Sequence, residues 1–266
     1  MSLVMLRRAW RDQAGNAASY AVGIILYSAM ILAFFPVARD HAAAFNSYLS
    51  AMPQALIRAF GISDFSTFSG FVGAELLRII WPIIVEVFAI MSGAALVAQE
   101  IERGTAEIWL SVPESRARLL ASKIAALFLA ELGLVIVTVI TLAIGAVILG
   151  EPVVLSRLLV LGVVLLSLSI VVAGYSVLFS AFFDARGRPA GIAAGVTIAF
   201  YMLWVASSFG SSWSWLRYLS IYAAFQPQAA LGGDPIPVLG VIALFIIGLA
   251  CAGASLVVFQ RRDVAV

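Results

Sequence analysis

The sequence has only one cysteine, Cys251, and only one histidine, His41. A single cysteine excludes a disulfide within the chain, and a single histidine excludes a metal cluster built from histidines. The pattern G-x-x-x-x-G-K-[ST], whose backbone cradles the phosphates of ATP, is missing, as are H-E-x-x-H and G-x-S-x-G. We therefore predict no catalytic residue, no metal site and no cofactor in this chain.

Charge is also scarce. Charged residues make up 11% of the 266 residues and hydrophobic residues 63%, whereas about a quarter of an ordinary soluble domain is charged. A soluble core could not bury that much apolar surface, so the composition predicts an integral membrane protein. The net charge of +2 is too small to indicate a nucleic-acid partner.

Long apolar runs fill most of the sequence. A helix of about 20 apolar residues crosses a bilayer, and six runs are long enough to do so. They cover approximately residues 17–38, 79–98, 119–149, 158–183, 189–209 and 236–259. We expect an all-α integral membrane fold, with a single six-span transmembrane domain over residues 1–266.

Two segments outside these runs are predicted to be amphipathic. In residues 1–13, Leu3, Leu6 and Trp10 share one helical face and three arginines lie nearer the other. This is typical of an N-terminal interfacial helix on anionic lipid, and a disordered basic tail is the alternative. Residues 39–75 repeat apolar side chains at helical steps and are interrupted by a proline, which predicts two short surface helices.

Arginine and lysine are distributed unevenly between the two sides that six spans create. Eleven of the sixteen lie on the side of the two termini, and five lie on the other side. Cytoplasmic segments of membrane proteins are enriched in these residues. We therefore predict a multi-pass protein of the plasma membrane whose termini, and whose segment between the second and third spans, are cytoplasmic.

Two carboxylates lie at membrane depth, Glu86 in the second span and Glu131 in the third. One carboxylate costs about 3 kcal/mol at the centre of a span, which the apolar residues of the run offset. Ionisable residues at this depth are candidates for a translocation path for ions or cationic cargo. A protonated carboxyl, or one bonded to a neighbouring serine or threonine, is the alternative. Just outside the second span, Glu75 and Arg78 are expected to pair.

Small residues recur at the start of the fifth span, where Gly187, Gly191 and Gly195 are spaced by four. Such a stripe allows another helix to approach closely, so we predict a helix-packing face there. Glycines that merely face lipid are the alternative. The segment after this span is rich in aromatic residues typical of the membrane interface, namely Trp213, Trp215, Tyr218, Tyr222 and Phe225.

The longest polar interruption between two strongly apolar runs is EIERGTAEIWLSVPESR, residues 100–116. Gly104 permits a backbone turn that other residues resist. Thr105 can then cap a short helix by accepting a hydrogen bond from a free backbone N–H. On that helix Trp109 contributes to an apolar surface, with Glu107 beside it. The first half of the stretch therefore predicts a short helix after a turn.

The second half of the stretch predicts the start of the next long helix. Ser111 stands three residues before Glu114, as in a capping box, and Pro113 would lie in the first turn. A short charged segment between two spans is well placed to contact a soluble partner. An ordinary solvated loop is the alternative.

The whole stretch resembles the signature of the permease subunits of type-2 ABC exporters, which are ATP-driven efflux systems. The matching positions are Glu100, Glu102, Gly104, Thr105, Glu107, Leu110, Ser111, Pro113, Ser115 and Arg116. Glu114 departs from the pattern, because the family usually has an apolar residue there. The resemblance extends more weakly over the full length, through the number of spans and the sizes of the loops.

The resemblance implies that this stretch forms a coupling helix that docks on a separate ABC ATP-binding subunit. The residues expected at that contact are Glu100, Glu102, Gly104, Thr105, Glu107, Trp109, Pro113 and Arg116. It also implies a second permease copy, identical or related, within the membrane lipid. ATP and Mg would be bound by the partner subunit, so this chain would not be an enzyme by itself.

Two other classes of function are considered. A secondary transporter or channel would use Glu86 and Glu131 for ion coupling, and its halves should show internal repeats. No convincing repeat is found in this sequence. The third class is a non-transporting membrane scaffold, for which the similarity of residues 100–116 to the exporter signature would be accidental. The cargo of an exporter is not readable from these residues.

Overall fold

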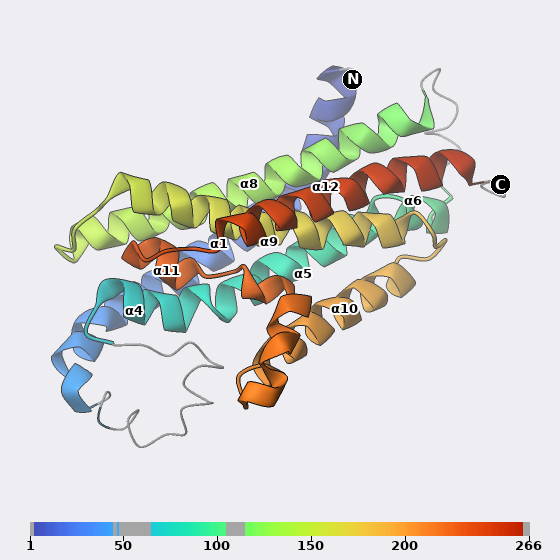
Figure 1. The fold of residues 1–266 in the computed structure, drawn as a ribbon. Helices are drawn as coiled ribbons and strands as arrows, with labels where there is room; N and C mark the ends of the chain where they lie inside the picture. Colours follow the sequence, from blue (N-terminus) through green and yellow to red (C-terminus); the bar gives the residue numbers. More distant parts are fainter. Residues whose placement is uncertain (1–2, 45–46, 48–64, 105–114, 263–266) are drawn as a thin grey trace.

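The structure is a computed structural model that describes residues 3–44, 47, 65–104 and 115–262 (Figure 1). Over these residues the chain forms helices and no strand, and six helical segments are long and apolar enough to cross a membrane. They are α1 (Leu3–Asp40), α4–η1–α5 (Phe68–Val72, Gly73–Leu77 and Ile80–Ala95), α8 (Arg116–Ile148), α9 (Leu155–Ser180), α10 (Gly187–Ala206) and α12 (Val238–Arg261). Between them lie α6 (Ala98–Glu102), η2 (Ser211–Leu219), η3 (Ile221–Ala223) and α11 (Pro227–Gly232). The predicted all-α, six-span fold is confirmed.

The basic N-terminal segment and the first apolar run form one helix, α1, of 38 residues. At about 1.5 Å per residue this helix is roughly 57 Å long, more than the roughly 45 Å of a whole bilayer. The N-terminal segment is therefore helical, as predicted, but it is not separate from the span. Gly15 lies at the junction, and its cost of about 1 kcal/mol is too small to end so long a helix. In Figure 1 the N-terminal part of α1 projects beyond the other helices.

The second span begins at Phe68, well before the predicted start near Ile79. The Thr67 hydroxyl caps α4 by accepting a hydrogen bond of 3.1 Å from the backbone N–H of Gly70. The helix then continues through the π-helical turn η1 into α5. Much of the region predicted as surface helices after residue 65 thus belongs to the span. The rest of that prediction, over residues 45–46 and 48–64, lies outside the described residues.

Glu75 and Arg78 consequently lie inside the second span rather than just outside it. The predicted pairing between them is wrong, because the Arg78 guanidinium lies over the ring of Trp204 in α10, 4.2 Å from the ring centroid. A cation over an aromatic face gains about 2 kcal/mol when both are shielded from water. Arg78, which follows η1, therefore joins the second span to α10 within the bundle.

Helix α9 lies at the centre of the bundle and contacts α5, α8, α10, α11 and α12. It approaches α12 most closely at Gly174, where an added Cβ would lie 2.2 Å from the carbonyl oxygen of Gly248. A Cβ added at Gly248 would in turn lie 2.6 Å from the carbonyl oxygen of Ile170. Only residues without a side chain allow two helix backbones to approach so closely.

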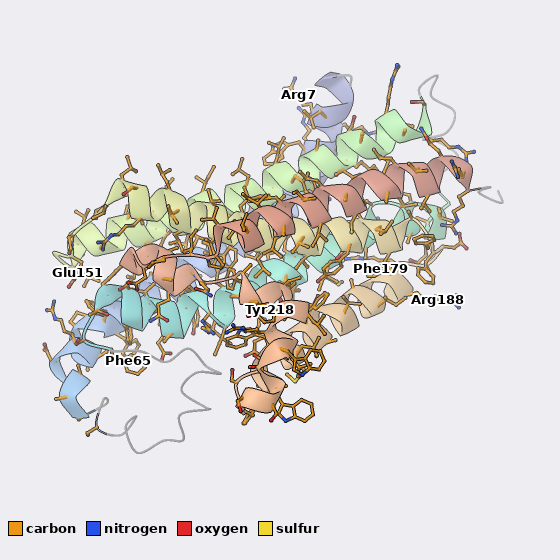
Figure 2. All side chains as sticks on the ribbon, in the orientation of Figure 1. Arg7, Phe65, Glu151, Phe179, Arg188 and Tyr218 are labelled. Carbon is orange, nitrogen blue, oxygen red and sulfur yellow. The ribbon has the colours of Figure 1, made fainter. Side chains whose placement is uncertain are left out.

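We call the two ends of the bundle the loop end and the distal end. The loop end carries α6, the start of α8, the turn between α9 and α10, and the end of α12. The distal end carries α4, the turn between α8 and α9, and η2, η3 and α11. Figure 2 labels Arg188 at the loop end and Glu151 at the distal end. There, Glu151 forms an ion pair of 3.2 Å with Arg39, which joins the end of α1 to the turn after α8.

The aromatic segment after α10 divides into two groups. Trp213, Trp215 and Tyr218 are exposed, as the predicted interfacial belt requires. Tyr222 and Phe225 are buried instead, and the Phe225 ring stacks on a tryptophan of α5. The last two residues therefore belong to the core and connect η3 to the second span.

Candidate functional site

Helices α5 and α6 are separated by a break that a hydroxyl group from α9 bridges. Ser180 donates a hydrogen bond of 2.7 Å to the carbonyl oxygen of Ala94 in α5. Its oxygen accepts hydrogen bonds from the backbone N–H groups of Val97 and Ala98, at 3.1 and 3.0 Å. Helix ends leave such backbone groups without partners inside the helix. The fully buried Ser180 thus satisfies three of them and fixes α6 to the end of α9.

Glu100 ties α6 to the third span. Its Oε1 lies 2.7 Å from the Nζ of Lys123 in α8, and the two side chains are 30% and 17% exposed. Such partial burial shields an ion pair from water and salt. The helix before residues 105–114 is therefore joined directly to the helix after them.

Glu102 ties α6 to the turn between α9 and α10. Its Oε2 accepts a hydrogen bond of 2.9 Å from the backbone N–H of Arg186, the residue that precedes α10. The Arg186 guanidinium donates a hydrogen bond of 3.3 Å to the carbonyl oxygen of Met91 in α5. Glu102 and Arg186 therefore hold α6 and the end of α5 to the start of α10.

On the other side of the central stretch, Arg116 begins α8 and donates a hydrogen bond of 3.0 Å to the carbonyl oxygen of Arg262. Arg262 follows α12 and donates to the carbonyl oxygens of Ala181 and Phe183, at 3.0 and 3.1 Å. It also forms an ion pair with Asp184. Cationic side chains are well suited to the unpaired carbonyls at a helix C-terminus. Arg262 therefore joins the start of α8 to the ends of α9 and α12.

The turn predicted at Gly104 is confirmed. Gly104 follows α6 with φ = 69°, in the left-handed region that glycine adopts without strain. Helix α8 begins at Arg116, and the Ser115 hydroxyl caps it by accepting a hydrogen bond of 3.4 Å from the backbone N–H of Arg118. The capping box predicted at Ser111 lies outside the described residues, as do the predicted coupling residues Thr105, Glu107, Trp109 and Pro113.

A polar cavity of about 440 Å³ borders this arrangement, between α1, the α5–α6 break and α8. Asp12, Asn16 and Arg103 line it together with both members of the Glu100–Lys123 pair. The Glu100–Lys123 pair therefore borders this cavity, while Ala98 and Ile101 of α6 pack on the core side. Within the described residues, no three Asp, Glu, His or Cys side chains cluster as metal ligands would.

Glu86 and Glu131 are both buried, in different surroundings. Glu86 Oε1 accepts a hydrogen bond of 2.6 Å from the hydroxyl of Tyr222 in η3. Burial raises the pKa of the Tyr222 phenol well above its ordinary value, which keeps it a donor. Both carboxyl oxygens of Glu131 lack a hydrogen-bond partner among the described residues. Glu86 therefore anchors η3 to the second span through a tyrosine, and no hydrogen bond joins the two carboxyls.

The glycine stripe of α10, formed by Gly187, Gly191 and Gly195, faces away from the rest of the chain. A Cβ added at any of the three would meet no described atom within 4 Å. Helix α10 instead packs through its opposite face, where the buried residues are Pro189, Ala193 and Thr197. The stripe therefore packs against no described helix of the same chain. Packing against a second copy stays a prediction.

Three residues that hold the loop end together were not singled out from the sequence. Arg186 and Arg262 were counted only as charges on one side of the membrane, and Ser180 was one of several serines in the fourth span. Each could have been noted as a polar residue at the end of a span. Their partners could not, because those partners lie far away in the sequence.

Comparison with known proteins identifies a family. A family model described as "ABC-2 family transporter protein" matches residues 10–264 of the chain. The match includes most of α1 and all of the five later spans. No curated protein matches the chain.

Proposed function

Because the chain belongs to the ABC-2 family of transporter proteins, we propose that it is the membrane subunit of an ATP-driven exporter and couples to a separate ATPase subunit. A membrane component of this family is a transporter permease and is not itself the catalyst. Residues 100–116 would receive the motion of the ATPase, and the spans would form the translocation path.

The observation that carries this proposal is the set of bonds on both sides of residues 105–114. Ser180, Glu100 and Glu102 tie the preceding helix, α6, to α5, α8, α9 and the start of α10. Arg116 ties the following helix, α8, to the end of α12. A partner that moved residues 105–114 would therefore act on five of the six spans at once.

Within the proposed dock, Trp109 is the apolar anchor and Glu107 lies near basic groups of the partner. Buried aromatic anchors often contribute about 2 kcal/mol or more to an interface, and charges at its rim contribute less. Trp109→Ala should therefore impair complex formation and export more than Glu114→Ala, at the position that departs from the family pattern. Co-purification and transport would be measured at matched abundance in the membrane. If both variants assemble and export like the parent, this stretch is only a solvated loop and the proposed dock is refuted.

We place the loop end in the cytoplasm, with the chain in the plasma membrane. The excess of arginine and lysine at this end supports that orientation. In a Cys251→Ser background, single cysteines at positions 106 and 187 should label from the cytoplasm, and those at 47 and 212 from the opposite side. Labelling of position 106 from outside would refute both the orientation and the dock.

ATP and Mg belong to the partner in this proposal. The purified chain should hydrolyse no ATP above background, because its sequence has no P-loop.

We further propose that two permease copies assemble in the membrane. The exposed glycine stripe of α10 is available for that contact.

A further inference from the structure

A large cavity in the distal half of the bundle is not part of the arrangement described above. Its volume is about 1190 Å³, and it lies between α10 and α12, over α9 and beside η2 and η3. Pockets for small organic molecules usually measure about 300–1000 Å³. Figure 1 shows α10 and α12 well apart, with η2 at the end of α10. The cavity is therefore large enough for a whole amphipathic molecule.

The lining of this cavity changes from apolar to polar along its length. Near the middle of the helices it consists mainly of apolar side chains, including Val171, Val196, Leu244, Ile247 and Cys251. At the distal end it carries the hydroxyl groups of Ser207, Ser208, Ser211, Ser214 and Ser220. Among the described lining residues Arg217 is the only charged one. The polar end therefore suits an anionic group.

Arg217 is held in position at this end. Its guanidinium donates a hydrogen bond of 2.6 Å to the hydroxyl of Tyr218, and Figure 2 labels Tyr218 on the segment beyond α10. The guanidinium also lies 4.7 Å from the centroid of the same ring. Neither contact neutralises its charge, and Arg217 is exposed. Guanidinium groups bind phosphates through two parallel N–H donors.

The segment that closes the distal end is anchored on two helices. Ser220 donates a hydrogen bond of 2.7 Å to the carbonyl oxygen of Phe200 in α10. Two residues further on, Tyr222 donates its hydrogen bond to Glu86 in α5. The polar end of the cavity is therefore formed before any ligand binds, which lowers the entropic cost of binding.

The apolar part of the cavity has the length of one membrane leaflet. Its wall on α12 runs from Gly240 to Cys251, which is about 17 Å at roughly 1.5 Å per residue. Half of the hydrocarbon core of a bilayer is about 15 Å thick. Ile247 on this wall is 47% exposed, so the cavity is open to molecules in the bilayer.

We propose that this cavity binds one phospholipid with an anionic headgroup, taken from the leaflet at the distal end. An acyl chain lies over α9 between α10 and α12. The phosphate lies at Arg217 and the hydroxyls of Ser208 and Ser211, because those of Ser207, Ser214 and Ser220 donate to backbone carbonyls. This site does not depend on the proposed coupling to an ATPase. A helix of a second copy is the other occupant that the groove could accept.

Native mass spectrometry of the full chain, released from nanodiscs of equal parts phosphatidylglycerol and phosphatidylcholine, tests the proposal. We expect one retained lipid per chain, with phosphatidylglycerol preferred. Arg217→Gln should lower that preference about two- to fivefold, the range expected for an exposed ion pair. Arg157→Gln, at another exposed arginine of the distal end that lies outside the cavity, should leave it unchanged. No retained lipid, or equal effects of the two variants, would overturn the proposal.

A second variant separates lipid from a second copy. Ala243 is exposed on α12 and lines the cavity, so Ala243→Trp should fill the groove with little strain on the fold. We expect this variant to retain neither phosphatidylglycerol nor phosphatidylcholine, and to keep the oligomeric state of the parent. If it becomes monomeric and keeps its lipid, the groove is an interface between copies, and the lipid site is refuted.

Discussion

Helices α9 and α10 are consecutive spans that both contain glycine, but they differ in how the bundle surrounds them. In the most apolar 18-residue window of each, 72% of α9 and 17% of α10 is buried. Gly174 of α9 contacts the backbone of α12, whereas the three regularly spaced glycines of α10 meet no described neighbour. A regular glycine repeat therefore does not by itself identify the face on which a membrane helix packs.

Polar bonds hold both helices. Helix α9 reaches other helices with Ser180, which bonds to the α5–α6 break, and with Tyr175, which bonds to Thr197 of α10. Helix α10 is also held at its start by Glu102, at Phe200 by Ser220 and near its end by Arg78. The two helices therefore differ in burial: α9 has the largest buried share of the six spans and α10 the smallest.

The largest expected effect separates the glycines of the two helices. Gly174→Ala should destabilise the fold by about 3 kcal/mol, because the added methyl group would overlap the Gly248 carbonyl. Gly191→Ala should leave the fold unchanged or stabilise it by up to about 1 kcal/mol, since alanine favours helices more than glycine does. Thermal unfolding in detergent would compare the two variants. Equal changes would mean that α9 and α10 are packed alike.

A smaller effect tests how the distal end of α10 is held. Tyr222→Phe should destabilise the protein by about 2 kcal/mol, because the buried carboxyl of Glu86 would lose its described partner. Tyr218→Phe is the matched control, since that hydroxyl is exposed and the change should cost little. The same unfolding assay applies. A Tyr222→Phe variant as stable as the control would show that the bond to Glu86 does not stabilise the position of η3.

The sequence predicts the number of spans well and their ends less well. Six apolar runs suffice for the six helices, because length and hydropathy alone decide whether a segment can cross a bilayer. The start of the second span was missed because Glu75 and Arg78 resemble a boundary. In the structure Arg78 finds an aromatic partner, Trp204, more than a hundred residues away. A contact of this kind is set by the tertiary fold and has no local signal.

For the candidate site, the sequence indicated residues in the central stretch but not the residues to which they bond. Glu100, Glu102, Gly104 and Arg116 stand out as polar residues or as a turn, and they lie between the second and third spans or at the start of the third. Their contact with an ATPase stays a prediction. Their partners Lys123, Arg186 and Arg262 depend on which helix ends meet at the loop end. In the fifth span the local pattern was regular, and the glycine repeat predicted a packing face. No described helix of this chain packs against that face.

The smallest stability effect concerns the two ion pairs at opposite ends of the bundle. Glu100→Gln should cost about 1 kcal/mol, because Lys123 is largely buried. Glu151→Gln should cost less than about 0.5 kcal/mol, because Arg39 is 48% exposed. Unfolding at low and high salt would distinguish them, since salt screens the exposed pair more strongly. A larger loss at Glu151 would indicate that the distal end, not the loop end, is the tightly bonded one.

The most direct test of the account is whether Ser180 transmits motion from the central stretch to the spans. Ser180→Ala removes the three hydrogen bonds at the α5–α6 break, whereas Ser176→Ala removes only a bond within α9. Both variants would be reconstituted with the proposed ATPase subunit, at matched abundance. We expect both to bind it, and Ser180→Ala alone to lose about fivefold or more of the transport that ATP drives. Equal transport by Ser180→Ala and Ser176→Ala would contradict the account.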